Sequence, residues 1–226
     1  MQILYEDNHL ILVNKAPGEI VQPDPSGDSS LEETVKRYLK EKYHKPGDVF
    51  LGVVHRIDRP VSGVVLFAKT SKALTRLNQM MKDRKITKTY LAIVRKAPMP
   101  AEGTLKDYLL RDASRNKTFR SQPGQKASRE AILHYKTLSA SERYFLLEIH
   151  LETGRHHQIR CQLSGIGCPI RGDLKYGYAR SNPDGGISLH AWKIEFIHPV
   201  TGNPLTMKAP VPGDILWKAL TENTLL

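Results

Sequence analysis

The chain has 226 residues, of which 40% are hydrophobic and 25% are charged, so it can bury the core of one large domain. This composition excludes a disordered chain, and no apolar run reaches the length of a membrane span. The formal net charge is +11, and residues 69–129 hold 16 Lys and Arg against four Asp and Glu. Such a segment favours a polyanionic partner, with a basic surface that binds nothing as the alternative.

The first residues carry acids and lack a cleavage site of small residues, so we expect no signal peptide. The sequence has two cysteines, Cys161 and Cys168, which suit a reducing compartment. We therefore expect a cytoplasmic protein without a membrane segment, a disulfide or a zinc site.

The first part of the chain predicts two strands, a loop and a helix. Residues 3–15 read as two short strands around an Asp-Asn turn, and residues 17–28 are rich in Pro, Gly and Asp. Ser30 and Glu33 have the spacing of a capping box, which predicts a helix that Pro46 stops.

Residues 63–69 form a nearly continuous apolar run, which predicts a strand in the centre of a sheet. We expect Ser71 to cap a second helix, and the basic, weakly patterned residues 105–129 to form a mobile loop or a loose hairpin. Further strands are predicted over 87–94, 131–138, 144–151 and 189–198, with a last short strand after a turn at 200–203. The sequence thus predicts one α+β domain over residues 1–226, with a large, mixed, mostly antiparallel sheet and flanking helices.

The stretch GVVHRIDRPVSGVVLFAKT, residues 52–70, places one carboxylate among cations just before the predicted central strand. Arg56 and Arg59 are expected to keep Asp58 ionised, because a nearby positive charge favours the carboxylate. An ionised carboxylate can act as a nucleophile or a base. The alternative is a charged turn without chemistry.

A second cluster, ETGRHHQIRCQL, covers residues 152–163. A helix that starts near Arg155 would place His156 and Arg160 on one face. A metal site is the weaker alternative, because arginines would repel a cation and no carboxylate joins the histidines in a motif. Its ligands would come from His55, His156, His157, His190 and His198. Tyr90, in KITKTYLAIV, could pack in the core or stack on a base, and its spacing leaves both open.

Five blocks of the sequence resemble, in the same order, those of the RluA-type family of RNA pseudouridine synthases. HRIDRPVSG resembles the signature His-Arg-Leu-Asp-Arg-x-x-Ser-Gly, and YEDNHLILVNKAPG, KTYLAIV and LHAWKIEFIHPVTG resemble three further blocks. TGRHHQIRCQLSGIGCPIRGDLKYG resembles Thr-Gly-Arg-x-His-Gln-Ile-Arg followed by Pro-Ile-x-Gly-Asp-x-x-Tyr-Gly. The resemblance covers most of the chain. It implies the pseudouridine synthase fold with a central RNA-binding cleft, and we expect no accessory RNA-binding domain before the catalytic domain.

Carried over by position, the resemblance implies four catalytic residues. Asp58 is the catalytic aspartate and pairs with Arg160, Arg56 enters the RNA stack when the target uridine is extruded, and Tyr90 stacks on the target base. The substrate-binding residues that the resemblance implies are His55, Arg59, Arg155, His157, Gln158, Leu189 and His190.

The implied reaction converts a uridine in structured ribosomal or transfer RNA to pseudouridine by base flipping, with no cofactor and no metal, and we expect a monomer. One alternative is a non-catalytic RNA-binding protein of the same fold, which should have lost Asp58, Tyr90 or Arg160, yet all three are present. Another is a nucleoside glycosidase, which would need a second acid.

Overall fold

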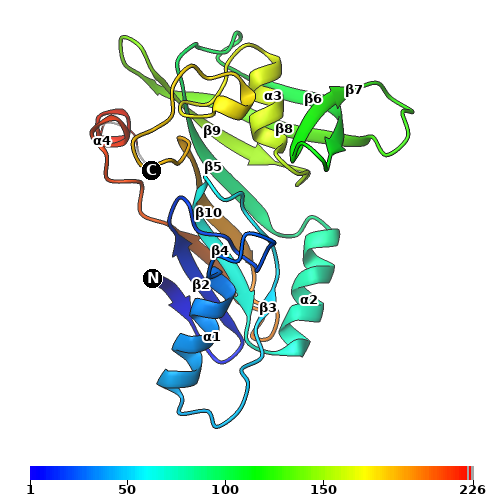
Figure 1. Cartoon of the computed structure of the whole chain (residues 1–226), viewed down its shortest axis with the longest axis vertical. Coiled ribbons are helices and arrows are strands. Elements are labelled where there is room, and N and C mark those ends of the chain that lie inside the picture. The colour runs from blue at the N-terminus through cyan, green and yellow to red at the C-terminus, as the bar shows by residue number, and fades with distance from the viewer. Residues whose placement is uncertain (223, 225–226) are drawn as a thin grey trace. The chain divides into compact units, whose positions relative to one another are not determined.

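The computed structural model describes residues 1–222 and 224, and the chain divides into two compact units (Figure 1). Unit 1 comprises Met1–Ile86 and Ala191–Pro210, and unit 2 comprises Thr87–His190 and the described residues from Val211 on. That residues 1–226 form a single domain stays a prediction, since two compact units can fold as one domain.

Unit 1 is a sheet with two helices, α1 (Leu31–Lys42) and α2 (Ser71–Lys82). Its strands run in the order β1-β2-β4-β10, with β11 beside β10 and β3 beside one end of β4. Their bounds are β1 Gln2–Glu6, β2 Leu10–Lys15, β3 Gly52–Val53, β4 Ser62–Ala68, β10 Leu189–Ile197 and β11 Pro204–Lys208. From Ala191 on, β10 belongs to unit 1.

The core of unit 1 explains the apolar run that predicted a central strand. Every residue of β4 is buried, because β2 and β10 flank it and both of its faces are covered. On one face, Val64 and Leu66 pack with Ala73 and Leu77 of α2. The capping box of α1 is confirmed, since Ser30 accepts from the Glu33 N–H and Glu33 accepts from the Ser30 N–H.

Gly63 is required where β4 approaches β10. Its φ of +118° lies in a region that side chains disfavour. A Cβ atom at this position would lie 2.2 Å from the carbonyl oxygen of Ala191. Gly63 of the signature motif therefore permits the close approach of β4 and β10.

Unit 2 is an antiparallel sheet in the order β5-β9-β8-β6-β7, with α3 (Gln158–Gly165) and α4 (Ile215–Thr221) (Figure 1). Helix α3 packs against β6, β7 and the short 3₁₀ helix η1 (Leu174–Tyr176), and α4 packs against β8 and β9. The strand bounds are β5 Thr87–Val94, β6 Glu102–Asp112, β7 Lys117–Ser121, β8 Arg129–Ala140 and β9 Phe145–Leu151. The α+β class and the mostly antiparallel pairing are confirmed.

Residues 105–129 differ from the prediction of a mobile loop. They contain most of β6 and all of β7, which pair from Tyr108–Ser121 to Asp112–Lys117 as a hairpin. The exposed edge of this hairpin is basic on both strands, so the apolar alternation that marks a strand is faint. The hairpin alternative was therefore the right one.

Two helix boundaries also differ, and one helix was not predicted. Thr70 rather than Ser71 caps α2, because its side chain accepts from the Ala73 N–H. Helix α3 starts at Gln158 rather than near Arg155, because His157 adopts a left-handed φ of 50°. Helix α4 was not predicted: it has seven residues, too few for a clear periodicity, although Asp214 caps it. No helix in residues 1–222 and 224 is long and apolar enough to cross a membrane.

Candidate active site

Asp58 lies in unit 1, on a tight turn that leads into β4. Its carbonyl oxygen accepts from the Val61 N–H over 3.0 Å, which closes the turn. Ile57 and Val61 are buried on either side and anchor the turn to the core. Asp58 itself is half-buried, and the closed turn fixes the backbone that carries its carboxylate.

Lys15 binds this turn through its side chain. The sequence did not reveal it as a site residue. Although it is fully buried, its Nζ donates to the carbonyl oxygens of Ala16, Glu19 and Arg59 over 2.8–3.0 Å. Burial lowers the pKa of Lys15 to about 8, against the opposing effect of Glu19 and Asp58. The lysine therefore ties β2 to the residue that follows Asp58. In the sequence, its position at the end of an apolar strand was the feature that could have indicated this role.

The two arginines beside Asp58 take different places. Arg59 was expected to flank the carboxylate, but its Nη2 donates to Oδ2 of Asp28 over 2.6 Å, because the turn directs the side chain toward the loop before α1. Arg56 is exposed, and within residues 1–222 and 224 the structure gives its guanidinium no ion pair. Arg56 is thus available to a ligand, while Arg59 stabilises the loop.

His55 is half-buried at the start of the same loop. Its Nε2 accepts from the Leu66 N–H over 3.2 Å, so this nitrogen carries no proton. The imidazole therefore holds the loop against β4. Its predicted role in binding substrate stays a prediction.

Arg160 lies in unit 2, on α3, and Asp173 holds it. Its Nε donates to Oδ2 of Asp173 over 2.7 Å, and its Nη2 donates to Oδ1 over 2.9 Å. Both side chains are buried, and the guanidinium carbon lies 5.0 Å from the ring centre of Tyr176. The bidentate Asp173 carboxylate and the Tyr176 ring together fix the orientation of the Arg160 guanidinium.

Tyr176 also connects α3 to the β6–β7 hairpin. Its hydroxyl accepts from the Thr118 N–H over 2.8 Å, donates to the Thr118 carbonyl oxygen over 3.2 Å and contacts Nδ1 of His157 over 3.0 Å. Burial, with Arg160 and His156 next, lowers the pKa of His157 to about 2, so this imidazole is neutral. Asp173 and Tyr176 lie in the block GDLKYG, but spacing alone could not assign these contacts.

His156 does not share a helix face with Arg160, because it precedes α3. Its ring stacks on His157 with 3.8 Å between centres. Its Nδ1 contacts the hydroxyl of Thr118 over 2.8 Å and its Nε2 contacts Oδ1 of Asn116 over 3.1 Å. His156 therefore holds the end of the hairpin.

Gln158 organises the loop before α3. Its Oε1 accepts from the Thr153 hydroxyl over 2.8 Å and from the Arg155 N–H over 3.0 Å, while its Nε2 donates to the Ile132 carbonyl oxygen. The Arg155 side chain is exposed, and its Nε donates to the Glu130 carbonyl oxygen. These contacts favour a positioning role for Gln158 and leave the end of Arg155 near solvent.

The other predicted residues of unit 2 lie on strands. Tyr90 is buried on β5, opposite Ile149 of β9. Leu189 and His190 are buried at the start of β10, and the His190 ring lies edge-on to Trp217, 6.1 Å between centres. Arg160 and His157 thus both contact Tyr176, and the Arg155 N–H binds Gln158. The pairing of Asp58 with Arg160 links residues of different units and stays a prediction.

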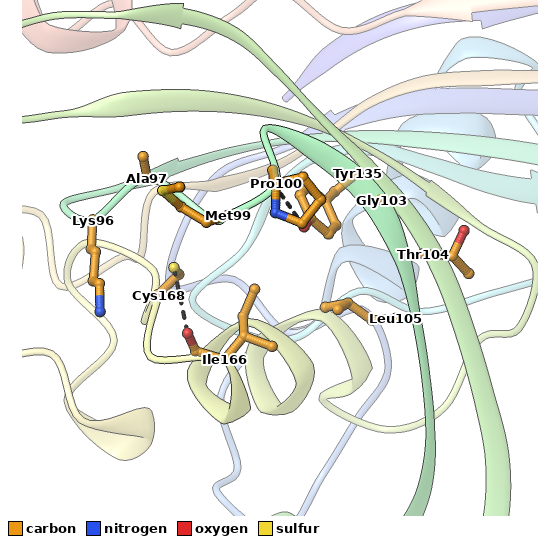
Figure 2. A pocket seen from close by; sticks show the side chains of 10 residues that line it. All are labelled: Lys96, Ala97, Met99, Pro100, Gly103, Thr104, Leu105, Tyr135, Ile166 and Cys168. Carbon is orange, nitrogen blue, oxygen red and sulfur yellow. Dashed lines mark hydrogen bonds between the residues drawn. The ribbon is translucent and has the colours of Figure 1, made fainter.

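A pocket of about 540 Å³ in unit 2 contains none of the predicted site residues (Figure 2). Figure 2 shows the Cys168 thiol directed to the Ile166 carbonyl oxygen, 3.8 Å away, and burial raises the pKa of this thiol. A protonated thiol is a weak nucleophile, so the environment of Cys168 does not activate it. Within residues 1–222 and 224, no three His, Cys, Asp or Glu side chains gather as metal ligands would.

Solved structures place the fold in one class. The chain superposes on human RNA pseudouridylate synthase domain containing 4 with a TM-score of 0.79 and 23% identity, over 96% of this chain and 90% of the human one. Human RNA pseudouridylate synthase domain containing 1 gives a TM-score of 0.72 at 23% identity, over 96% of this chain and 86% of the human one. The fold is therefore that of the pseudouridine synthases.

Sequence comparison then identifies the family. Residues 9–165 match the family model of RNA pseudouridylate synthases. An uncharacterized RNA pseudouridine synthase of Bacillus subtilis, YhcT, is 34% identical over 95% of this chain and 70% of its own length. Ribosomal large subunit pseudouridine synthase D of Xylella fastidiosa is 34% identical over 100% of this chain and 71% of its own length. The tRNA pseudouridine synthase C of Pectobacterium carotovorum is 33% identical over 92% of this chain and 58% of its own length. The chain belongs to the RNA pseudouridylate synthase family and is an RNA-modifying isomerase.

Proposed function

We propose that the chain modifies a uridine of structured ribosomal or transfer RNA in the cytoplasm, as a monomer and without metal or cofactor. Relatives named for ribosomal large subunit RNA and for tRNA support both RNA classes. The exposed cations of the β6–β7 hairpin, such as Arg111 and Arg115, suit a phosphate backbone. Sedimentation of the purified chain tests the oligomeric state.

We assign the chemistry to Asp58. The observation that carries this assignment is the turn of Asp58, held by Lys15 and by the Gly18 N–H, which both bind the Arg59 carbonyl oxygen. A carboxylate on a fixed backbone can be aimed at one atom of a flipped nucleotide. Attack on C1′, attack on the base and removal of a sugar proton all require this carboxylate to be ionised.

The other catalytic residues follow from their surroundings. Arg56, exposed on the same loop, is assigned to fill the gap that the extruded uridine leaves in the RNA stack. Tyr90 is assigned to stack on the target base. Arg160, which Asp173 orients, is assigned to pair with Asp58. His55, Arg59, Arg155, His157, Gln158, Leu189 and His190 support the bound substrate or the groups that hold it.

The reaction breaks the bond from ribose C1′ to uracil N1 and forms one from C1′ to C5. N1 gains a proton and C5 loses one, so atoms balance without any redox step. Because the C5 hydrogen leaves to water, tritium at that position reports each turnover.

The test uses C5-tritiated total RNA from a strain that lacks the enzyme, with wild-type protein and Asp58→Ala. We expect tritium release by the wild type, and at least about 1,000-fold slower release by Asp58→Ala with nearly unchanged RNA binding. Fractionation of the RNA then locates the uridine. Comparable release by Asp58→Ala would overturn its role. Tight binding without release would indicate a non-catalytic RNA-binding protein, and labelled free uracil a glycosidase.

A further inference from the structure

Lys88 is a cation of unit 2 that has no role in the proposed reaction. It is the second residue of β5, next to Thr89, which pairs with His150 near the end of β9. Since β5 and β9 are antiparallel, β5 begins where β9 ends, and Lys88 lies beside the loop that follows β9. A Cβ atom at Gly154 in that loop would lie 3.2 Å from the Lys88 Nζ.

Lys88 has no partner within the described chain. Its side chain is half-buried, and burial lowers its pKa with no carboxylate opposing the effect. In residues 1–222 and 224, the structure gives its Nζ no hydrogen bond and no ion pair. By contrast, the buried Lys15 has three carbonyl oxygens and Lys69 has Glu6. An ammonium group withdrawn from water without a counter-ion is unfavourable, so an anion from outside the chain would stabilise it.

The loop beside Lys88 is ordered, yet it provides no acceptor. Thr153 and Arg155 are fixed by Gln158, on either side of Gly154. Gly154 is exposed, and its N–H has no acceptor in the part of the chain that the structure describes. A residue with a side chain at this position would crowd the Lys88 Nζ. The Lys88 Nζ beside this loop and the Gly154 N–H within it are thus two donors without an acceptor in the described part of the chain.

The position of Lys88 relative to Tyr90 identifies the ligand. Side chains two residues apart on a strand point to the same face, about 6.6 Å apart along it. A nucleotide whose base stacks on Tyr90 would bring a neighbouring phosphate within reach of Lys88. A full negative charge satisfies a half-buried ammonium better than a base carbonyl does. We propose that Lys88, with the Gly154 N–H, binds a phosphodiester that flanks the target uridine. This inference rests on the proposed stacking of the target base on Tyr90.

The test uses a transcript that contains the uridine located by the tritium assay. It is made in three forms: unmodified, and with a neutral methylphosphonate at the phosphate on the 5′ or the 3′ side of that uridine. With enzyme in excess, tritium release at rising enzyme concentration gives the half-saturating concentration and the maximal rate. The proteins are wild type, Lys88→Met and Lys40→Met. Lys40 is exposed on α1 of unit 1, so its variant controls for the loss of one charge.

We expect Lys88→Met to raise the half-saturating concentration about tenfold and to change the maximal rate less than about threefold, whereas Lys40→Met changes neither by more than about twofold. One of the two methylphosphonates should weaken wild-type binding about tenfold and leave Lys88→Met unaffected. Equal behaviour of Lys88→Met and Lys40→Met overturns the inference. So does equal sensitivity of wild type and Lys88→Met to both RNAs.

Two further results keep the inference separate from the proposed function and from folding. If Lys88→Met does not fold, the wild-type protein alone tests the inference. A half-saturating concentration that neither methylphosphonate changes would exclude the contact. If the wild type releases no tritium from any RNA, the proposed function fails. Filter binding of total tRNA and rRNA then tests the contact, since Lys88→Met should lower the slope of log affinity against log salt by about one. An unchanged slope overturns it.

Discussion

Asp173 determines where the Arg160 guanidinium points, because both of its oxygens bind that group and both side chains are buried. Asp173→Asn removes the charge and one acceptor, so the guanidinium loses its fixed direction. We expect the maximal rate of tritium release to fall about 10- to 100-fold, with the half-saturating enzyme concentration within about threefold of wild type.

Asp173→Glu separates positioning from stability. It restores the negative charge but moves the carboxylate outward by one methylene, so urea unfolding should recover more than the rate does. A rate that recovers in step with the free energy of unfolding would mean that Asp173 stabilises unit 2 and does not orient Arg160. The measurements are single-turnover rates and urea melts of both variants.

Lys15 contributes to stability with a predictable pH dependence. Its pKa is about 8 in the folded chain, because burial outweighs the attraction of Glu19 and Asp58, against 10.5 as the ordinary value. Between these pH values the unfolded chain holds the proton and the folded chain does not, so the contribution to the free energy of unfolding rises with pH. It is complete above pH 10.5 and lost as pH falls through 8.

Lys15→Met tests this contribution. It removes the Nζ donor from three carbonyl oxygens, of which that of Arg59 keeps the Gly18 N–H, so we expect a loss of about 2–4 kcal/mol near pH 7. The difference from wild type should grow between pH 8 and 10.5, by up to about 3 kcal/mol. Urea melts across this range measure it, with Lys36→Met, which breaks a partly buried pair with Glu32, as the control. A difference that does not change with pH would refute the shifted titration.

At the level of elements, the hydroxyl group of Tyr176 contributes to holding the β6–β7 hairpin. Tyr176 binds both backbone groups of Thr118, so Tyr176→Phe leaves a buried N–H and a carbonyl oxygen unsatisfied. We expect amide hydrogen exchange over 117–121 to accelerate about tenfold, while β8 and β9 keep their protection. The matched control is Tyr108→Phe, on the same hairpin. Equal exchange in both variants would show that the hairpin is held by its own pairing.

The same elements show what the sequence could and could not predict. The apolar run of β4 and the capping box of α1 depend on neighbours along the chain, so both were predicted correctly. The start of α3 depends on the left-handed His157, which contacts Tyr176, 19 residues away. Local pattern therefore placed the helix three residues early.

The candidate site divides in the same way. The resemblance to the family identified Asp58, Arg56, Tyr90 and Arg160, whose pairing and roles stay predictions. It did not identify the groups that hold them, because Lys15 binds the turn across 44 residues and Asp173 binds Arg160 across 13. Such contacts exist only after folding, so residue type and spacing could not reveal them. The bond of Arg59 to Asp28, 31 residues away, could not be read from spacing for the same reason.

For the whole molecule, the question is whether RNA affinity follows the net charge of +11 or the placement of the charges. Arg111, Lys126 and Arg129 are exposed on or beside the β6–β7 hairpin of unit 2. Arg37, Lys40 and Lys45 are equally exposed on or beside α1 of unit 1. Replacing either set with Gln lowers the net charge equally, so the two triple variants differ only in location.

We expect the hairpin variant to reduce the slope of log affinity against log salt by about 2, because each cation that neutralises a phosphate contributes about 0.7–0.9. The α1 variant should leave the slope within about 0.5 of wild type, since charges away from the RNA are screened within a Debye length of about 8 Å. Filter binding of the target transcript over 50–300 mM salt, a range of about sixfold, measures both slopes. Equal slopes for the two variants would mean that RNA responds to the overall field of the protein and that the hairpin is not a preferred contact.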